Sequence, residues 1–179
     1  MKTQLKKVSK ETEISTEEKK HLRALYRECF INAHQLLNEG KLLAEHGHYA
    51  RATFLALTAH EEMGKAQLIA DYAQGCSSKK EFQEAFRDHR IKHAYMMREA
   101  TAESDATIVY NKDRSTYQIE LREKALYVAW RNTYDNLVAP SQITRDECDS
   151  VFERVLEAFE EIEHAERLNG RIGSKGLFK

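Results

Sequence analysis

Hydrophobic positions recur at helical spacing in five stretches of this chain, and each stretch predicts an α-helix. Four of the five begin with Ser or Thr followed three residues later by Glu or Gln, the capping-box pattern of helix N-termini. The single proline, Pro140, is expected to stop the fourth helix. The expected helices cover residues 15–38 (or 15–46 if Gly40 only weakens the first), 48–74, 78–100, 115–138 and 144–169. They predict an all-α, single-domain antiparallel bundle of about five helices.

The amino-acid composition supports the same fold class and a single domain. One proline and seven glycines among 179 residues, with 32% charged residues, are typical of a helical protein. The polar, lysine-rich residues 1–14 predict a flexible N-terminal arm, and residues 15–170 form the expected helical domain. Within it, residues 101–114 predict a connector, and residues 171–179 a C-terminal tail.

Charge and cysteine usage narrow the classes of function. A formal net charge of -1 provides no general attraction for nucleic acid, so any RNA contact must come from a local patch. The three cysteines show no C-x-x-C spacing, which disfavours a zinc site or a disulfide framework and indicates reduced thiols. The chain has neither a signal-peptide pattern nor an apolar run of about eighteen residues. We therefore expect a cytoplasmic protein without a membrane segment.

A polar island interrupts the apolar stripe of the second expected helix. At about 100° per residue, Glu61, Glu62 and Lys65 fall in the middle of this stripe, with Arg51 on the same side. Burying an unpaired charge costs several kcal/mol, so these groups should be paired, hydrogen-bonded or placed in a wet pocket. The apolar members of the stripe are Phe54, Leu55, Leu57, Leu68, Ile69 and Tyr72.

A second polar intrusion occupies the third expected helix. His89 and His93, four residues apart, lie in the centre of its apolar stripe, with Arg90 and Lys92 at its edges. We expect the two imidazoles and the acid-rich turn of the preceding helix to face each other across adjacent helices.

The simplest interpretation of the acidic turn is that it stabilises the structure and has no catalytic role. Glu61 and Glu62 lie four and three residues before Lys65, the favourable order for ion pairs along a helix. A partly buried salt-bridge cluster that sets the helix register would use the same residues.

Three functional interpretations also fit. Glu62 with His89 or His93 could coordinate a divalent metal, but the ligand count is low, and we expect neither a metal nor another cofactor. Alternatively, His89 or His93 acts as a general acid or base on an RNA 2′-hydroxyl while nearby cations stabilise the phosphorane-like charge. In the third, the polar pocket binds an anion or a partner protein's side chain.

Three segments resemble markers of the AbiV family of bacterial abortive-infection proteins. The alanine-rich helix that leads into Glu-Glu-x-Gly-Lys at residues 61–65 resembles the first marker. The segment Phe86-x-x-His89-x-x-Lys92 resembles the second, and residues 124–128 followed by Pro140 resemble the third. Together they cover roughly residues 30 to 140 in the family's order.

The resemblance implies an all-helical fold of the HEPN type, a homodimer, and a role in phage defence in which AbiV-like proteins arrest translation. The wider HEPN group includes metal-independent ribonucleases with an Arg-x4-6-His motif, which Arg87 and His93 match. On an unbroken helix these two side chains would lie more than about 100° apart, so Arg90 is the better placed cation.

We therefore predict a phage-defence protein that arrests translation or cleaves RNA as a metal-independent ribonuclease. RNA or the translation machinery and a phage-encoded activator protein are its expected partners. The alternative is a non-enzymatic helical protein whose polar cluster is structural or binds a partner or a metal. The predicted catalytic residues are Glu61, Glu62, Lys65, His89, Lys92 and His93, with Arg51, Arg87 and Arg90 as cations that bind RNA or another anion.

Overall fold

The computed structural model describes residues 14–75, 77–95, 112–130 and 137–168. Most of the predicted arm, the connector over 101–111 and the tail over 171–179 lie outside these residues. The elements are α1 (Thr16–Glu45), α2 (Tyr49–Ala73), α3 (Lys79–Arg87), α4 (His89–Tyr95), α5 (Lys112–Leu126), β1 (Ala129–Trp130), β2 (Leu137–Val138), the 3-10 turn η1 (Pro140–Gln142) and α6 (Arg145–Leu168). The predicted all-α class is confirmed, with a short antiparallel pairing of β1 and β2 added to it.

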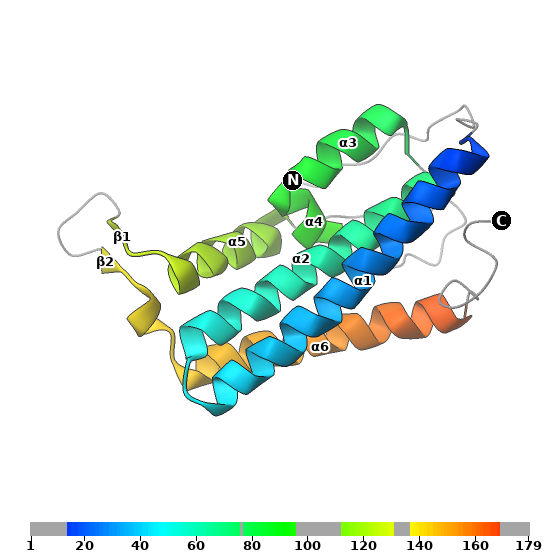
Figure 1. Ribbon diagram of the computed structural model, residues 1–179. Coiled ribbons are helices and arrows are strands. Elements are labelled where there is room, and N and C mark those ends of the chain that lie inside the picture. The colour runs from blue at the N-terminus through cyan, green and yellow to red at the C-terminus, as the bar shows by residue number, and fades with distance from the viewer. Residues whose placement is uncertain (1–13, 76, 96–111, 131–136, 169–179) are drawn as a thin grey trace.

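Helices α1 and α2 form a long antiparallel hairpin (Figure 1). The side chain of Ser15 caps α1 by accepting a hydrogen bond from the Glu18 amide, at 3.1 Å. The helix continues through Gly40, where a Cβ would lie 2.9 Å from Cζ of Phe152. Glycine is therefore useful there because it lets α6 pack closely. Gly47, at φ 79°, occupies the left-handed conformation in the turn before α2.

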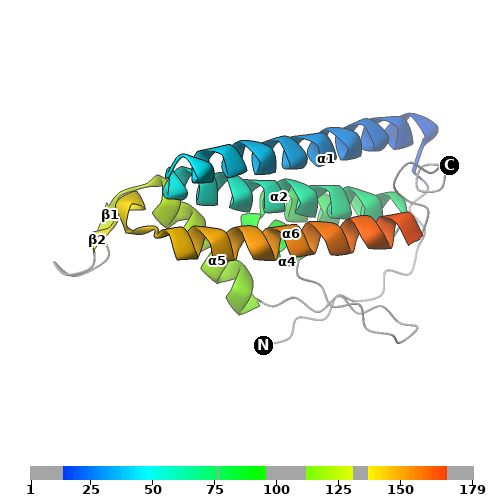
Figure 2. The same cartoon turned by 90° about the horizontal axis from the view of Figure 1, so that it is seen from below.

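Helix α2 is the centre of the molecule. It contacts α1, α3, α4, α5 and α6, and both views show it running alongside α1 and α6 (Figures 1 and 2). Side chains from these three long helices form most of the main core, to which α5 and the segment before α6 also contribute. The largest members of this core are Leu37, Leu57, Met63, Leu121, Ile143, Phe152 and Phe159. Because α2 is covered on several sides, the buried polar residues along it need partners from another element or from the helix itself.

The third expected helix is broken at Asp88, which corrects the prediction of one helix from 78 to about 100. Asp88 has an extended backbone (φ -89°, ψ 114°) that ends α3. Its carboxylate then accepts a hydrogen bond from the Arg90 amide at 2.8 Å, as a helix-capping residue does. The break lets α4 start in a new direction, and the last described residue of α4 is Tyr95.

The fourth expected helix is shifted and shorter than predicted. Helix α5 starts at Lys112, so the predicted capping box at 115–118 is wrong: Gln118 is buried inside the bundle instead of capping a helix end. The helix ends at Leu126, well before Pro140, because the β-prone run from Tyr127 to Trp130 leads into the β1–β2 pairing.

The starts of α1 and α6 lie where the sequence predicts them. Ser15 and Thr144 precede α1 and α6, and Thr144 exchanges capping-box hydrogen bonds with Glu147 at 3.1 and 3.2 Å. Cys29 and Cys148 are free and buried. None of the described helices is long and apolar enough to cross a bilayer.

Candidate functional site

The carboxylate of Glu61 is the centre of a buried polar cluster between α2 and α4. It accepts a hydrogen bond from Nδ1 of His89 at 2.8 Å and pairs with Nζ of Lys92 at 3.0 Å. Nε2 of His93 lies 3.9 Å from the same carboxylate. The side chains of Glu61 and Lys92 are each 5% exposed, so this ion pair is shielded from water. We call Glu61, His89, Lys92 and His93 the Glu61 cluster.

A glycine makes this approach of the two helices possible. A Cβ on Gly64 would lie 2.1 Å from the carbonyl oxygen of Lys92, closer than any real contact. The backbone of α4 therefore rests directly on α2 at Gly64, one turn beyond Glu61. This contact brings His89 and Lys92 within hydrogen-bond distance of Glu61, which explains in physical terms why a glycine follows the two acidic residues.

Burial and hydrogen bonding act in opposite directions on Glu61. Burial alone would raise the pKa of Glu61, but hydrogen bonds from His89 and Lys92 and their charges outweigh it and lower the pKa. Glu61 is therefore an ionised carboxylate at neutral pH, held by donors that come from another helix.

Glu62 and Lys65 lie on a different side of α2. They form an i,i+3 ion pair, which we call the Glu62–Lys65 pair. Burial and then the charge of Glu62 raise the pKa of the Cys29 thiol to about 12, so this carboxylate faces α1. Nζ of Lys65 lies 5.9 Å from the ring centroid of Phe86 on α3. The acidic turn thus divides between two environments.

A second buried histidine, His60, extends the Glu61 cluster into the core. Its Nδ1 lies 3.1 Å from Nδ1 of His93, and the two rings are nearly parallel, with an interplanar angle of 21° and centroids 5.3 Å apart. Burial lowers the pKa of His60 well below its usual value, and lowers that of His93 to about 4 although the charge of Glu61 opposes the change. Both imidazoles are neutral at pH 7.

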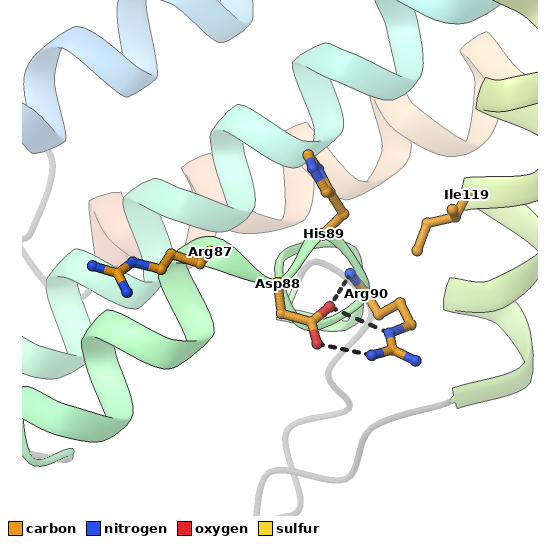
Figure 3. A pocket seen from close by; sticks show the side chains of 5 residues that line it. All are labelled: Arg87, Asp88, His89, Arg90 and Ile119. Carbon is orange, nitrogen blue, oxygen red and sulfur yellow. Dashed lines mark hydrogen bonds and ion pairs between the residues drawn. The ribbon is translucent and has the colours of Figure 1, made fainter.

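At the surface, a cavity of about 440 Å³ opens beside the cluster. It is lined by Arg87, Asp88, His89, Arg90 and Ile119 (Figure 3). The His89 side chain is 54% exposed. The guanidinium of Arg90 is held by Asp88 through contacts of 3.2 and 3.3 Å, while Arg87 points away from His89 (Figure 3).

A family model described as AbiV, of the HEPN group, matches residues 21–158. The chain belongs to the AbiV family. This confirms the resemblance seen in the sequence and makes the protein a member of an abortive-infection, phage-defence family. No curated protein and no solved structure matches the chain.

In this AbiV-family protein, the predicted site residues fall into three groups. Glu61, His89, Lys92 and His93 are brought together, and Arg87 and Arg90 line the cavity beside them. Glu62 and Lys65 lie on another side of α2. Arg51 is exposed and lies ten residues before Glu61, about 15 Å along the helix axis.

Two functional neighbours were missed by the sequence analysis. His60 lies within the marker segment but was not assigned a role, although its place next to Glu61 was a visible signal. Arg122, on α5, stacks on Phe54 with 5.0 Å between guanidinium carbon and ring centroid, and its charge contributes to the lowered pKa of His93. No sequence pattern connects residue 122 with residue 93.

The side chains around Glu61 bear on the possible metal site at Glu62 and the two histidines. Glu61, not Glu62, contacts the two histidines, and Lys92 occupies the same carboxylate as a permanent cation. Over the described ranges, no group of three or more His, Cys, Asp or Glu residues is arranged to hold a metal ion.

Proposed function

We propose that this AbiV-family protein limits phage propagation by cleaving RNA without a metal ion, with His89 as the general base. The observation that carries the proposal is the hydrogen bond from the half-exposed His89 ring to the buried carboxylate of Glu61, at the edge of a cavity lined by two arginines. An imidazole oriented by a carboxylate is the usual arrangement of a proton-accepting histidine in enzymes.

The proposed step follows from the protonation of the ring. Because Nδ1–H of His89 donates to Glu61, the neutral ring keeps a lone pair on Nε2. Nε2 removes the proton of a 2′-hydroxyl, the oxygen forms a bond to the adjacent phosphorus, and the bond from phosphorus to the 5′ oxygen breaks. The leaving oxygen takes a proton from a water molecule, and the hydroxide that this produces removes the proton from Nε2, which restores the neutral ring. Products are a 2′,3′-cyclic phosphate and a 5′-hydroxyl.

The side chains beside His89 have separate parts in this proposal. Arg90 and Arg87 lie at the cavity, where their charges favour the phosphate and its pentacovalent transition state. Lys92 is 5% exposed and His93 is fully buried, so neither reaches a substrate. Their proposed part is to hold the Glu61 carboxylate in place. The proposed substrate is cellular RNA of the translation apparatus.

The test is an RNA-cleavage assay with purified protein. Total cellular RNA and tRNA are incubated with the wild type, with His89→Ala, and with His164→Ala as a matched control at an exposed histidine of α6. Cleavage that survives EDTA, is lost in His89→Ala and persists in His164→Ala supports the proposal. Cleavage retained in His89→Ala, or none in the wild type, refutes it.

A second candidate is a protein that binds RNA or a protein partner without cutting it. The orientation of the two arginines favours this second candidate. Arg90 is held by Asp88, and Arg87 points away from His89 (Figure 3). Neither guanidinium is therefore directed at a phosphate that could react at His89. A gel-shift assay on the same RNA separates the two, because this candidate gives retention without cleavage. The homodimer, the phage-encoded activator and the cytoplasmic location remain predictions from the sequence.

A further inference from the structure

The reaction proposed above uses His93 only to hold Glu61 and does not use His60 at all, although the two imidazole rings are in contact and both are fully buried. Two imidazoles that meet Nδ1 to Nδ1 at 3.1 Å can form a hydrogen bond only if one nitrogen carries the proton and the other does not. The pair therefore has two possible arrangements of protons, and its surroundings decide between them.

The Glu61 carboxylate distinguishes the two arrangements. If His93 were the donor at Nδ1, its Nε2 would present a lone pair to a carboxylate oxygen 3.9 Å away, which is repulsive. If His60 is the donor, Nε2 of His93 carries the hydrogen and presents it to the same oxygen. At 3.9 Å this is an electrostatic contact and not a hydrogen bond, and Nε2 of His93 has no hydrogen-bond partner within the part of the chain that the structure describes. The second arrangement is therefore favoured.

Charged groups around the pair come from every helix packed against it. Glu61 lies on α2, and His89 and Lys92 lie on α4. Arg122 of α5 and Arg154 of α6 add positive charge near His93 and His60 respectively. Burial, helped by these cations, keeps both rings neutral, so the pair works as a fixed donor–acceptor chain and carries no charge.

We propose that His93 is a positioning residue, whose Nε2–H directs the Glu61 carboxylate towards His89, and that His60 holds His93 in the tautomer that can do so. The buried chain runs from His60 through His93 and Glu61 to His89. Its effect is to keep the exposed ring in the Nδ1–H tautomer, with Nε2 open to a substrate. The inference rests on the proposed function only for the identity of that substrate.

The test reads tautomers directly, by two-bond ¹H–¹⁵N correlation spectra of the protein labelled at its histidines. In the wild type, His93 is expected as the Nε2–H tautomer and neutral His89 as the Nδ1–H tautomer. In His60→Leu, which removes the donor at similar volume, we expect His93 to lose its preference and His89 to shift towards Nε2–H. His60→Asn, whose amide can donate in place of Nδ1–H, should restore the wild-type pattern.

Kinetics provide the second measurement. With RNA as substrate, His60→Leu should lower kcat about tenfold or more and leave KM within about twofold, because the base is misoriented and the cavity is unchanged. A wild-type His93 in the Nδ1–H form, or a folded His60→Leu protein with an unchanged His89 tautomer, overturns the inference. Because the spectra need no substrate, an absence of cleavage would refute the proposed function and leave the positioning chain to be judged by its tautomers.

Discussion

Two carboxylates that are neighbours in the sequence have very different surroundings in this protein. Glu61 is buried and receives donors from another helix, namely His89 and Lys92. Glu62 has a local partner, Lys65, one turn along its own helix, and its side chain is 13% exposed. The 100° between successive helical residues is enough to direct the first carboxylate to α4 and the second to α1.

The difference shows what an acidic pair in a helix can do. The Glu62–Lys65 pair needs nothing but its own helix, so it stabilises that helix wherever the helix packs. The Glu61 cluster forms only when α4 packs on α2, so its hydrogen bonds and ion pairs depend on the correct packing of the two helices. Function is expected where the polar partners come from different elements, because only there does the fold control their geometry.

The largest expected effect is on stability when each carboxylate is neutralised. Glu61→Gln leaves the buried Lys92 ammonium without its counter-charge, and we expect a loss of about 3–5 kcal/mol in the free energy of unfolding. Glu62→Gln breaks a partly exposed pair and should cost about 1 kcal/mol or less. Urea denaturation followed by far-UV circular dichroism measures both. Equal losses would mean that the two environments do not differ as described.

The next effect concerns the contact that creates the Glu61 cluster. Gly64→Ala places a methyl group against the Lys92 carbonyl, so α4 must move, and we expect a net cost of about 2–3 kcal/mol. Gly40→Ala is the contrasting control, because its tightest new contact is with the tip of the Phe152 ring, which can shift, while the nearest backbone atom, the Ala52 carbonyl oxygen, lies at 3.3 Å. It should cost about 1 kcal/mol or less, since alanine also favours the helix.

A double-mutant cycle sharpens this prediction. If Gly64→Ala acts by separating α4 from Glu61, its cost should fall by at least about 1 kcal/mol in a Glu61→Gln background. Additive costs would show that the glycine matters for packing alone.

Acid should lower the stability of the protein through the buried histidines near Glu61. Burial lowers the folded-state pKa of His93 to about 4, so between pH 7 and pH 5 the unfolded chain takes up a proton that the folded chain does not. The free energy of unfolding is not reduced by His93 at pH values above the pKa of an unfolded histidine. As the pH falls below that pKa, His93 lowers the free energy of unfolding, by about 2 kcal/mol at pH 5. His60 acts in the same direction. Stability measured across this range should fall less steeply in His93→Asn.

The smallest expected effect is at the break between α3 and α4. Asp88→Ala removes the acceptor for the Arg90 amide and should cost about 1 kcal/mol. Asp88→Asn keeps an acceptor oxygen and should cost no more than a few tenths of a kcal/mol. Thermal unfolding compares the two variants. If Asp88→Asn is as costly as Asp88→Ala, the carboxylate acts through the charge of Arg90 and not as a cap.

How far the sequence predicts the fold is clear from particular helices. The stripe of α2 and the capping boxes at Ser15, Ser78 and Thr144 marked real helix boundaries, because a cap and a phase of 3.6 residues are local properties. The break at Asp88 was missed because apolar and imidazole positions on both sides of it fit one stripe. The early end of α5 was missed because its strand partner, β2, lies beyond it in the chain.

Helical periodicity alone places Glu61 and Glu62 in the apolar stripe of α2, and it correctly indicates that His93 is buried. It does not predict that the His89 side chain, at the start of α4, is 54% exposed. Which carboxylate meets which imidazole is fixed by the packing of α4 on α2. That choice depends on the bend at Asp88 and on the close contact at Gly64, where one missing methyl group sets the distance between two helices. Distances of this kind arise from packing between elements, and no pattern within one element encodes them.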